Sequence, residues 1–132
     1  MARIGVIGAG QMGLAMALRL HDAGHAVTVR DIDNTREALA AAGGAAIAPH
    51  PAALAARCEL LIVAVVDAAQ TSDVLFGADG AAAALPAGAT VMLCATIAPD
   101  DVEAAARRLA GRGLACSDAA MAGGPVRARD GT

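Results

Sequence analysis

The opening segment of this chain constrains its fold more than any other part. A run of apolar residues ends at Ile7 and leads directly into the spacing Gly-x-Gly-x-x-Gly. The three glycines are Gly8, Gly10 and Gly13, and an amphipathic stretch follows them. This order predicts a strand, a tight turn at Gly8 and a helix that packs closely at Gly13. Gly10 would let a ligand approach the main chain, and the helix N-terminus would face its phosphates.

The residues predicted to hold a dinucleotide begin with this turn and continue at the end of a second apolar run. Asp31 ends that run and lies 18 residues after Gly13, close to the roughly 20 expected for a carboxylate that binds the adenosine ribose. Such a carboxylate repels a 2′-phosphate, which favours NAD over NADP. The turn residues of this predicted site are Gly8, Ala9, Gly10, Gln11, Met12 and Gly13.

Two alternatives stay open at this position. Asp31 could merely begin a turn, with Asp33 or Asn34 capping the next helix. Arg30 and Arg36 could reach a 2′-phosphate, which would allow NADP.

Length and composition limit the class of protein. The 132 residues suffice for one domain, 1–132, and 57% of them are hydrophobic although only 1% are aromatic. No apolar run reaches the ~18 residues of a membrane-spanning helix, and no signal peptide is recognisable, so we expect a cytoplasmic protein. A net charge of −3 with scattered arginines predicts no nucleic-acid partner. Cys58, Cys94 and Cys116 are too widely spaced for a metal site and are expected to be buried, reduced thiols.

Strand and helix patterns alternate along the whole chain, which predicts an α/β protein of the Rossmann type with a doubly wound, mainly parallel sheet. After the first two strands, the later elements are predicted from apolar runs, glycines and prolines. They are strands at Leu60–Val65, Thr90–Leu93 and Leu114–Cys116, and helices at Pro51–Ala56, Ala81–Leu85 and Pro99–Ala110.

Ligands of such sheets bind at the carboxyl ends of the strands. Thr96 follows a predicted buried strand, so its hydroxyl could bind a ribose, a nicotinamide or a substrate. Alternatively, Thr96 bonds only to the local backbone.

These segments together resemble the β-hydroxyacid dehydrogenase family, which includes 3-hydroxyisobutyrate dehydrogenase and 6-phosphogluconate dehydrogenase. Within that family, the Asp67–Gln70 and Val74–Gly77 segments resemble the L-threonate (four-carbon sugar acid) dehydrogenases most. The residues that carry the family resemblance are Gly8–Gly13, Ala23–His25, Thr96–Pro99, Asp118–Ala119, Gly123–Gly124 and Gly131–Thr132.

The resemblance implies hydride transfer between NAD and a small hydroxy acid such as L-threonate or 3-hydroxyisobutyrate. It implies that Val66 and Asp67 border the cofactor and that Thr96 contacts the nicotinamide ribose. Substrate binding would fall to Ala122, Gly123 and Gly124, whose amides suit a carboxylate.

Two departures from the family pattern qualify this expectation. Ala122 stands where the family usually has a serine. All ten basic residues are arginines, so the family's catalytic lysine is absent. No residue of this chain is therefore predicted to be catalytic. We therefore expect a chain truncated before the family's all-helical C-terminal domain, from a parent that is a homo-oligomer, with self-association of the exposed fragment possible. A non-catalytic nucleotide-sensing module, or an imine or keto-acid reductase on the same scaffold, are the alternatives.

Overall fold

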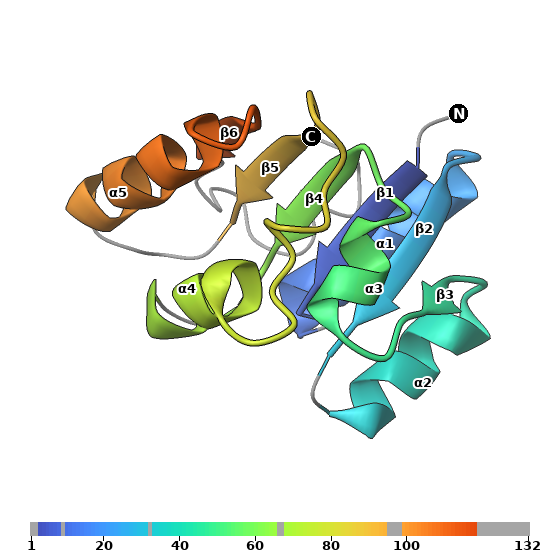
Figure 1. Ribbon diagram of the computed structural model, residues 1–132. Coiled ribbons are helices and arrows are strands. Elements are labelled where there is room, and N and C mark those ends of the chain that lie inside the picture. Colours follow the sequence, from blue (N-terminus) through green and yellow to red (C-terminus); the bar gives the residue numbers. More distant parts are fainter. Residues whose placement is uncertain (1–2, 9, 32, 66–67, 95–98, 119–132) are drawn as a thin grey trace.

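The computed structural model describes residues 3–8, 10–31, 33–65, 68–94 and 99–118. Strands and helices alternate through these residues, as Figure 1 shows, and confirm the predicted α/β class. In chain order the elements are β1 (Arg3–Ile7), α1 (Gln11–Asp22), β2 (Ala26–Arg30), α2 (Asn34–Ala42), β3 (Ala46–Ile47), α3 (Pro51–Ala55), β4 (Leu60–Val63), α4 (Ala68–Phe76), β5 (Thr90–Leu93), α5 (Pro99–Ala110) and β6 (Ala115–Asp118).

The described strands form one parallel sheet in the order β3-β2-β1-β4-β5-β6. This is the predicted doubly wound arrangement, because the chain moves outward from β1 in one direction and then from β4 in the other. Ile7 at the end of β1 pairs with Arg30 of β2 and with Val63 of β4. The three central strands therefore end side by side, where the strand order reverses and a doubly wound sheet binds its ligand.

Alternating side chains of the central strands pack into two cores, one on each face of the sheet. Val6 and Ile62 belong to the core under α1 and α2, whereas Ile7 and Leu61 belong to the core under α3, α4 and α5. Figure 1 shows α3 in front of β1 and α1 behind it. Burial on both faces explains why the central strands are apolar without interruption.

Helix ends follow their local sequence signals. The Asp33 carboxylate caps α2 by accepting a hydrogen bond from the Thr35 N–H. Gly24, at φ +96°, follows α1 in the left-handed conformation that favours glycine. Acidic side chains in the first turn of α5 and arginines in its last turn complement the helix dipole.

One predicted helix is wrong: residues 81–85 form turns instead. The amide N–H groups of Ala81 and Ala82 donate to the carbonyls of Val74 and Leu75, so this segment folds back onto α4. Pro86 disfavours helical geometry at the residue before it, and the single turn therefore does not propagate.

Two predicted strand boundaries are also corrected. β4 ends at Val63 and not at residue 65, because β1 ends at Ile7 and offers no further partner. β6 spans Ala115–Asp118 in place of Leu114–Cys116, and its register with β5 pairs Leu93 with Asp118.

Candidate functional site

The glycine turn joins β1 to α1 at the carboxyl edge of the sheet. Gly8 is buried and has φ +96°, and a Cβ on it would lie 2.5 Å from the carbonyl oxygen of Ala64. Its N–H donates to the Arg30 carbonyl over 2.9 Å, while the Ala64 N–H donates to the Ile7 carbonyl over 2.8 Å. The turn is thus wedged between the ends of β2 and β4, and only glycine fits there.

Gly13 lies in the first turns of α1 and has a packing reason to be glycine. A Cβ at this position would overlap the carbonyl oxygen of Gly8 and would lie 3.3 Å from the Cβ of Ala64. The missing side chain therefore lets α1 begin directly against the turn and the edge of the sheet, as the sequence predicts.

Gly10 has neither a conformational nor a packing reason to be glycine. Its φ of −66° and ψ of −171° suit any residue, and it is half-buried. Among the residues that the structure describes, none lies within 4 Å of a Cβ built on it. The missing side chain leaves open space outside the protein, which is what a backbone that is approached by a ligand requires.

The N-terminus of α1 begins at this open glycine. Gly10 is the N-cap and provides no side-chain acceptor, and the described first turn carries no acidic residue. The basic residues Arg19 and His21 lie in the last turn instead. The positive end of the helix dipole is therefore not neutralised by acidic side chains of its own first turn, and its N–H groups suit an anionic group. Gln11 and Met12 occupy the first two helical positions.

Asp31 follows β2 directly and is part of an ordered turn. One of its carboxylate oxygens accepts a hydrogen bond from the Asp33 N–H over 2.8 Å. Asp33 in turn caps α2 through Thr35. Because the neighbouring Arg30 carbonyl binds the Gly8 N–H, Asp31 is tied to the glycine turn through one peptide unit. The structure therefore brings the end of β2 and the turn together, as expected for an acid that binds ribose.

Glu37 is a residue near this site that the sequence did not single out. It lies in the first turn of α2, and its Oε2 accepts a hydrogen bond from the Asp31 N–H over 3.3 Å. The same oxygen is 3.7 Å from a guanidinium nitrogen of Arg30. A glutamate seven positions after an arginine is a weak signal alone, and only the turn between β2 and α2 brings the pair together.

Several predicted site residues lie outside the described residues. β4 and β5, which precede Val66 and Thr96 in the sequence, end beside each other, since Val63 pairs with Leu93. The predicted positions that the structure does not describe are Ala9, Val66, Asp67, Thr96, Ala122, Gly123 and Gly124.

The cysteines and other ligating side chains do not form a metal site in the described part of the chain. No group of three His, Cys, Asp or Glu side chains comes together there. Cys58 and Cys94 are buried and Cys116 is half-buried, and no disulfide joins any two of them. Burial raises the pKa of the Cys58 thiol from 9.0 to about 11, which makes it a poor nucleophile at neutral pH. None of the described helices is both long and apolar enough to span a membrane.

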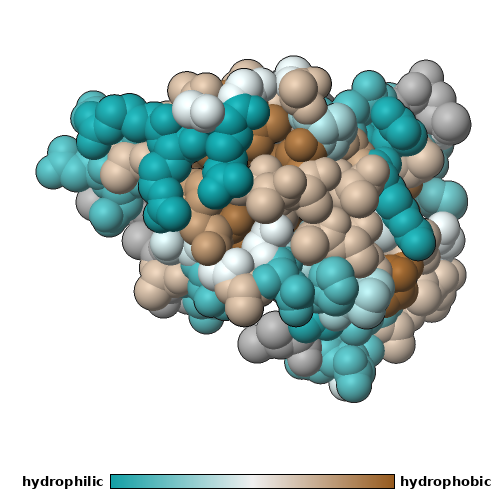
Figure 2. Space-filling model, viewed as in Figure 1, coloured by the Kyte–Doolittle hydropathy of each residue, from teal (hydrophilic) through white to brown (hydrophobic). Residues whose placement is uncertain are grey.

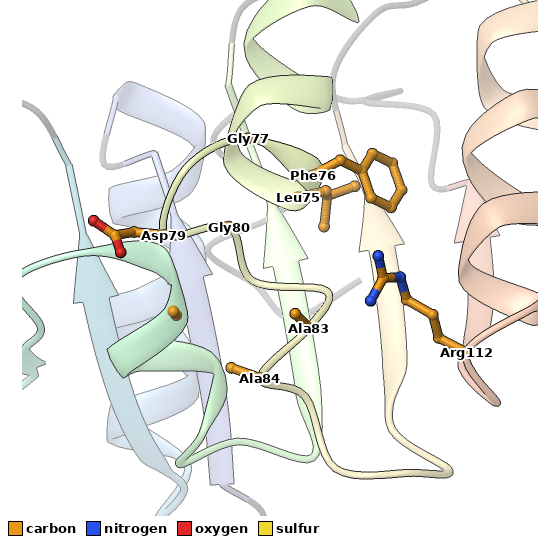
Figure 3. Close-up of a pocket in the computed structure, with 9 residues that line it drawn as sticks. Leu75, Phe76, Gly77, Asp79, Gly80, Ala83, Ala84 and Arg112 are labelled. Atoms are coloured by element: carbon orange, nitrogen blue, oxygen red, sulfur yellow. The ribbon is translucent and has the colours of Figure 1, made fainter.

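A shallow pocket of about 300 Å³ opens on the face that carries α3. Figure 2 shows that small, weakly hydrophobic side chains cover the middle of this face, with hydrophilic ones gathered over α5 at the upper left. In Figure 3, Arg112 extends toward Phe76 and Leu75 from the turn after α5. The guanidinium of Arg108 stacks on the Phe76 ring, 3.8 Å from its centroid. Of the predicted cofactor-binding residues that the structure describes, none lines this pocket.

The family is decided by a match over nearly the whole chain. Residues 3–132 match the NAD binding domain of 6-phosphogluconate dehydrogenase. The chain belongs to this family. Its glycine turn is therefore the turn of a nicotinamide-dinucleotide-binding domain, and the predicted family resemblance is confirmed.

Individual relatives of this NAD-binding domain support the same assignment. The chain is 46% identical to an L-threonate dehydrogenase of Cupriavidus necator over 97% of its own length and 43% of that protein. The structure of a 3-hydroxyisobutyrate dehydrogenase from Salmonella typhimurium superposes with a TM-score of 0.90 at 33% identity, over 97% of this chain and 45% of the other. An imine reductase of Streptomyces aurantiacus superposes with a TM-score of 0.75 at 34% identity, over 86% and 38%. The chain thus spans less than half the length of these relatives.

Proposed function

We propose that this chain is the cofactor-binding domain, residues 1–132, of an NAD-dependent β-hydroxyacid dehydrogenase. The observation that carries the proposal is the open space at Gly10, between a glycine turn that is fixed by packing and the unneutralised N-terminus of α1. Gly8 and Gly13 are required by the fold itself, whereas Gly10 is explained by a ligand that approaches the main chain. The similarity to an L-threonate dehydrogenase supports the substrate class.

The residues of the turn would hold the pyrophosphate. Gly8 would shape the turn, since its own N–H is bonded to the Arg30 carbonyl. Backbone N–H groups from Ala9 to Gly13, including those of Gly10, Gln11 and Met12, would face the phosphate oxygens, and the Asp31 carboxylate would accept hydrogen bonds from the adenosine ribose. A bound nicotinamide dinucleotide supplies the hydride acceptor or donor of the reaction. The arrangement of Asp31 favours NAD over NADP, because a second phosphate there would meet a carboxylate.

The remaining site residues are proposed from the family pattern. Val66 and Asp67 would border the cofactor, and Thr96 would contact the nicotinamide ribose. Ala122, Gly123 and Gly124 would face the carboxylate of a small hydroxy acid such as L-threonate or 3-hydroxyisobutyrate. Because the chain contains no lysine, we expect it to bind the cofactor without turnover.

Calorimetric titration with NAD and NADP tests the cofactor proposal directly. We expect NAD to bind more tightly than NADP to the wild-type chain. Gly10→Ala should abolish or strongly weaken binding while costing no more than about 1 kcal/mol of stability from the N-cap position, since its Cβ meets none of the described residues. Gly111→Ala is the matched control, because its Cβ would make only ordinary contacts of 3.5 Å and 3.6 Å at the end of α5. Absence of binding to both cofactors, or wild-type affinity in Gly10→Ala, would contradict the proposal.

An imine reductase is the second candidate, favoured by the structural similarity to one such enzyme and by Ala122 in place of the family's serine. The two candidates share the cofactor site and differ in substrate. Steady-state assays of the complete gene product on L-threonate, 3-hydroxyisobutyrate and a cyclic imine distinguish them. Oxidation of a hydroxy acid supports the dehydrogenase, whereas activity on the imine alone supports the reductase.

A further inference from the structure

The junction between β2 and α2 is built around one buried carboxylate. Glu37 is a charged residue that is buried, with an exposure of 9%. Its Oε2 accepts the hydrogen bond from the Asp31 N–H and faces the Arg30 guanidinium. A buried carboxylate is costly unless it is paired and hydrogen-bonded, and both of its partners here come from the end of β2.

Arg30 lies where a cation would affect the choice of cofactor. Its carbonyl accepts the hydrogen bond from the Gly8 N–H, so the residue adjoins the glycine turn. An arginine near the ribose-binding acid is the residue type that accommodates a 2′-phosphate in this kind of fold. In this structure the side chain of Arg30 is 24% exposed, and its guanidinium lies 3.7 Å from the carboxylate of Glu37 in the first turn of α2.

From this geometry we infer that Glu37 is a positioning residue that sets cofactor specificity, an inference that rests on the proposed function. Glu37 fixes the peptide of the ribose-binding Asp31 through the backbone hydrogen bond. It also withholds the Arg30 guanidinium from a 2′-phosphate by pairing with it. The preference for NAD therefore comes from two residues: the carboxylate of Asp31 excludes the second phosphate, and the carboxylate of Glu37 holds back the nearest arginine.

Glu37→Gln separates these two tasks, because the glutamine amide oxygen still accepts the Asp31 N–H but no longer holds a cation by charge. Titrations with NADH and NADPH, followed by the fluorescence of the reduced nicotinamide, measure both affinities. We expect Glu37→Gln to bind NADPH about tenfold more tightly than the wild type, the worth of one charge-assisted hydrogen bond. NADH affinity should change by less than about threefold. The exposed Glu103→Gln on α5 is the matched control and should change neither affinity.

The double variant Arg30→Gln/Glu37→Gln tests whether Arg30 is the cation released. The gain in NADPH affinity should disappear in it. A gain that persists would come from removal of the Glu37 charge alone or from the exposed Arg36, and would overturn the inference. Unchanged selectivity between NADH and NADPH in Glu37→Gln would overturn the inference as well. An equal loss of affinity for both cofactors would show that Glu37 has a purely structural role, and would also overturn it.

Arg30→Gln alone keeps the inference testable if Glu37→Gln does not fold. If Glu37 already holds the guanidinium away, this variant should not weaken NADPH binding relative to NADH. A selective loss of NADPH affinity would show that Arg30 contacts the 2′-phosphate in the wild type, and would overturn the inference. Wild-type protein that binds neither cofactor refutes the proposed function and this inference with it, whereas wild-type NADH binding with unaltered selectivity in the variants refutes the inference alone.

Discussion

Gly13→Ala is the substitution for which the structure makes the sharpest prediction about stability. An ideal Cβ at this position overlaps the carbonyl oxygen of Gly8 and crowds its carbonyl carbon. Both atoms belong to the backbone, and Gly8 is itself held by the hydrogen bond to Arg30. A side-chain rotation cannot relieve the overlap, so α1 has to move away from the turn and from the edge of the sheet.

Two opposing effects set the magnitude. Overpacking in a well-packed interior costs typically about 1–3 kcal/mol. Replacing glycine by alanine within a helix returns up to about 1 kcal/mol through helix propensity. Because the clash is with rigid backbone, we expect the upper part of the range and a net loss of about 1–2 kcal/mol. For a chain of this length, that corresponds to a melting temperature lower by about 4–8 °C.

Thermal and urea unfolding, followed by far-ultraviolet circular dichroism, measures this loss of stability. Circular dichroism is the suitable signal because the chain has no Trp or Tyr whose fluorescence could report unfolding. Gly111→Ala serves as the control and should shift stability by no more than about 0.5 kcal/mol. Cofactor affinity should also fall in Gly13→Ala, since the moved helix no longer presents its N-terminus to the turn. Wild-type stability in Gly13→Ala would refute the close approach of α1 to the turn on which the site depends.

Two further predictions concern the core on the α3 face. Leu54→Ala should cost about 2–5 kcal/mol in a urea denaturation experiment, because Leu54 is fully buried and fills the space that Gly5 leaves open; Leu39→Ala, at 47% exposure, should cost no more than about 0.5 kcal/mol. Stability should also fall as the pH rises from about 9 to about 11, because burial raises the pKa of Cys58 from 9.0 to about 11 and the unfolded thiol therefore ionises first. Besides Cys58 the chain contains two further thiols, Cys94 and Cys116, and no Lys or Tyr, so Cys58→Ala should reduce the dependence without abolishing it, and an equal slope in this variant would contradict the assignment to Cys58.

Much of the fold could be predicted because its signals are local. The strand at Thr90–Leu93 and the helix at Pro99–Ala110 have the predicted bounds, since an apolar run and a proline at the helix start mark them directly. The segment 81–85 was predicted wrongly because its alanine content favours a helix, while its hydrogen bonds go back to α4. In this segment the tertiary contact with α4, which the sequence does not reveal, outweighs the helix propensity of alanine.

The candidate site, like the fold, could be predicted only in part. The glycine spacing indicates the turn, and the structure supplies a different physical reason for each glycine: backbone conformation at Gly8, packing at Gly13, and open space at Gly10. The part played by Glu37 could not be predicted, because it depends on how the turn after Asp31 brings α2 back against the end of β2. An ion pair across a turn leaves no periodic or spacing signal in the chain.

The central claim, that a nicotinamide dinucleotide binds at the glycine turn, is tested most directly by mapping NAD binding onto backbone amides by nuclear magnetic resonance. Titration with NAD should shift the amide signals of Gly8, Gly10 and Gly13 most, followed by those around Asp31. Shifts concentrated instead on the pocket around Phe76 and Arg112, or no shifts at saturating NAD, would contradict it.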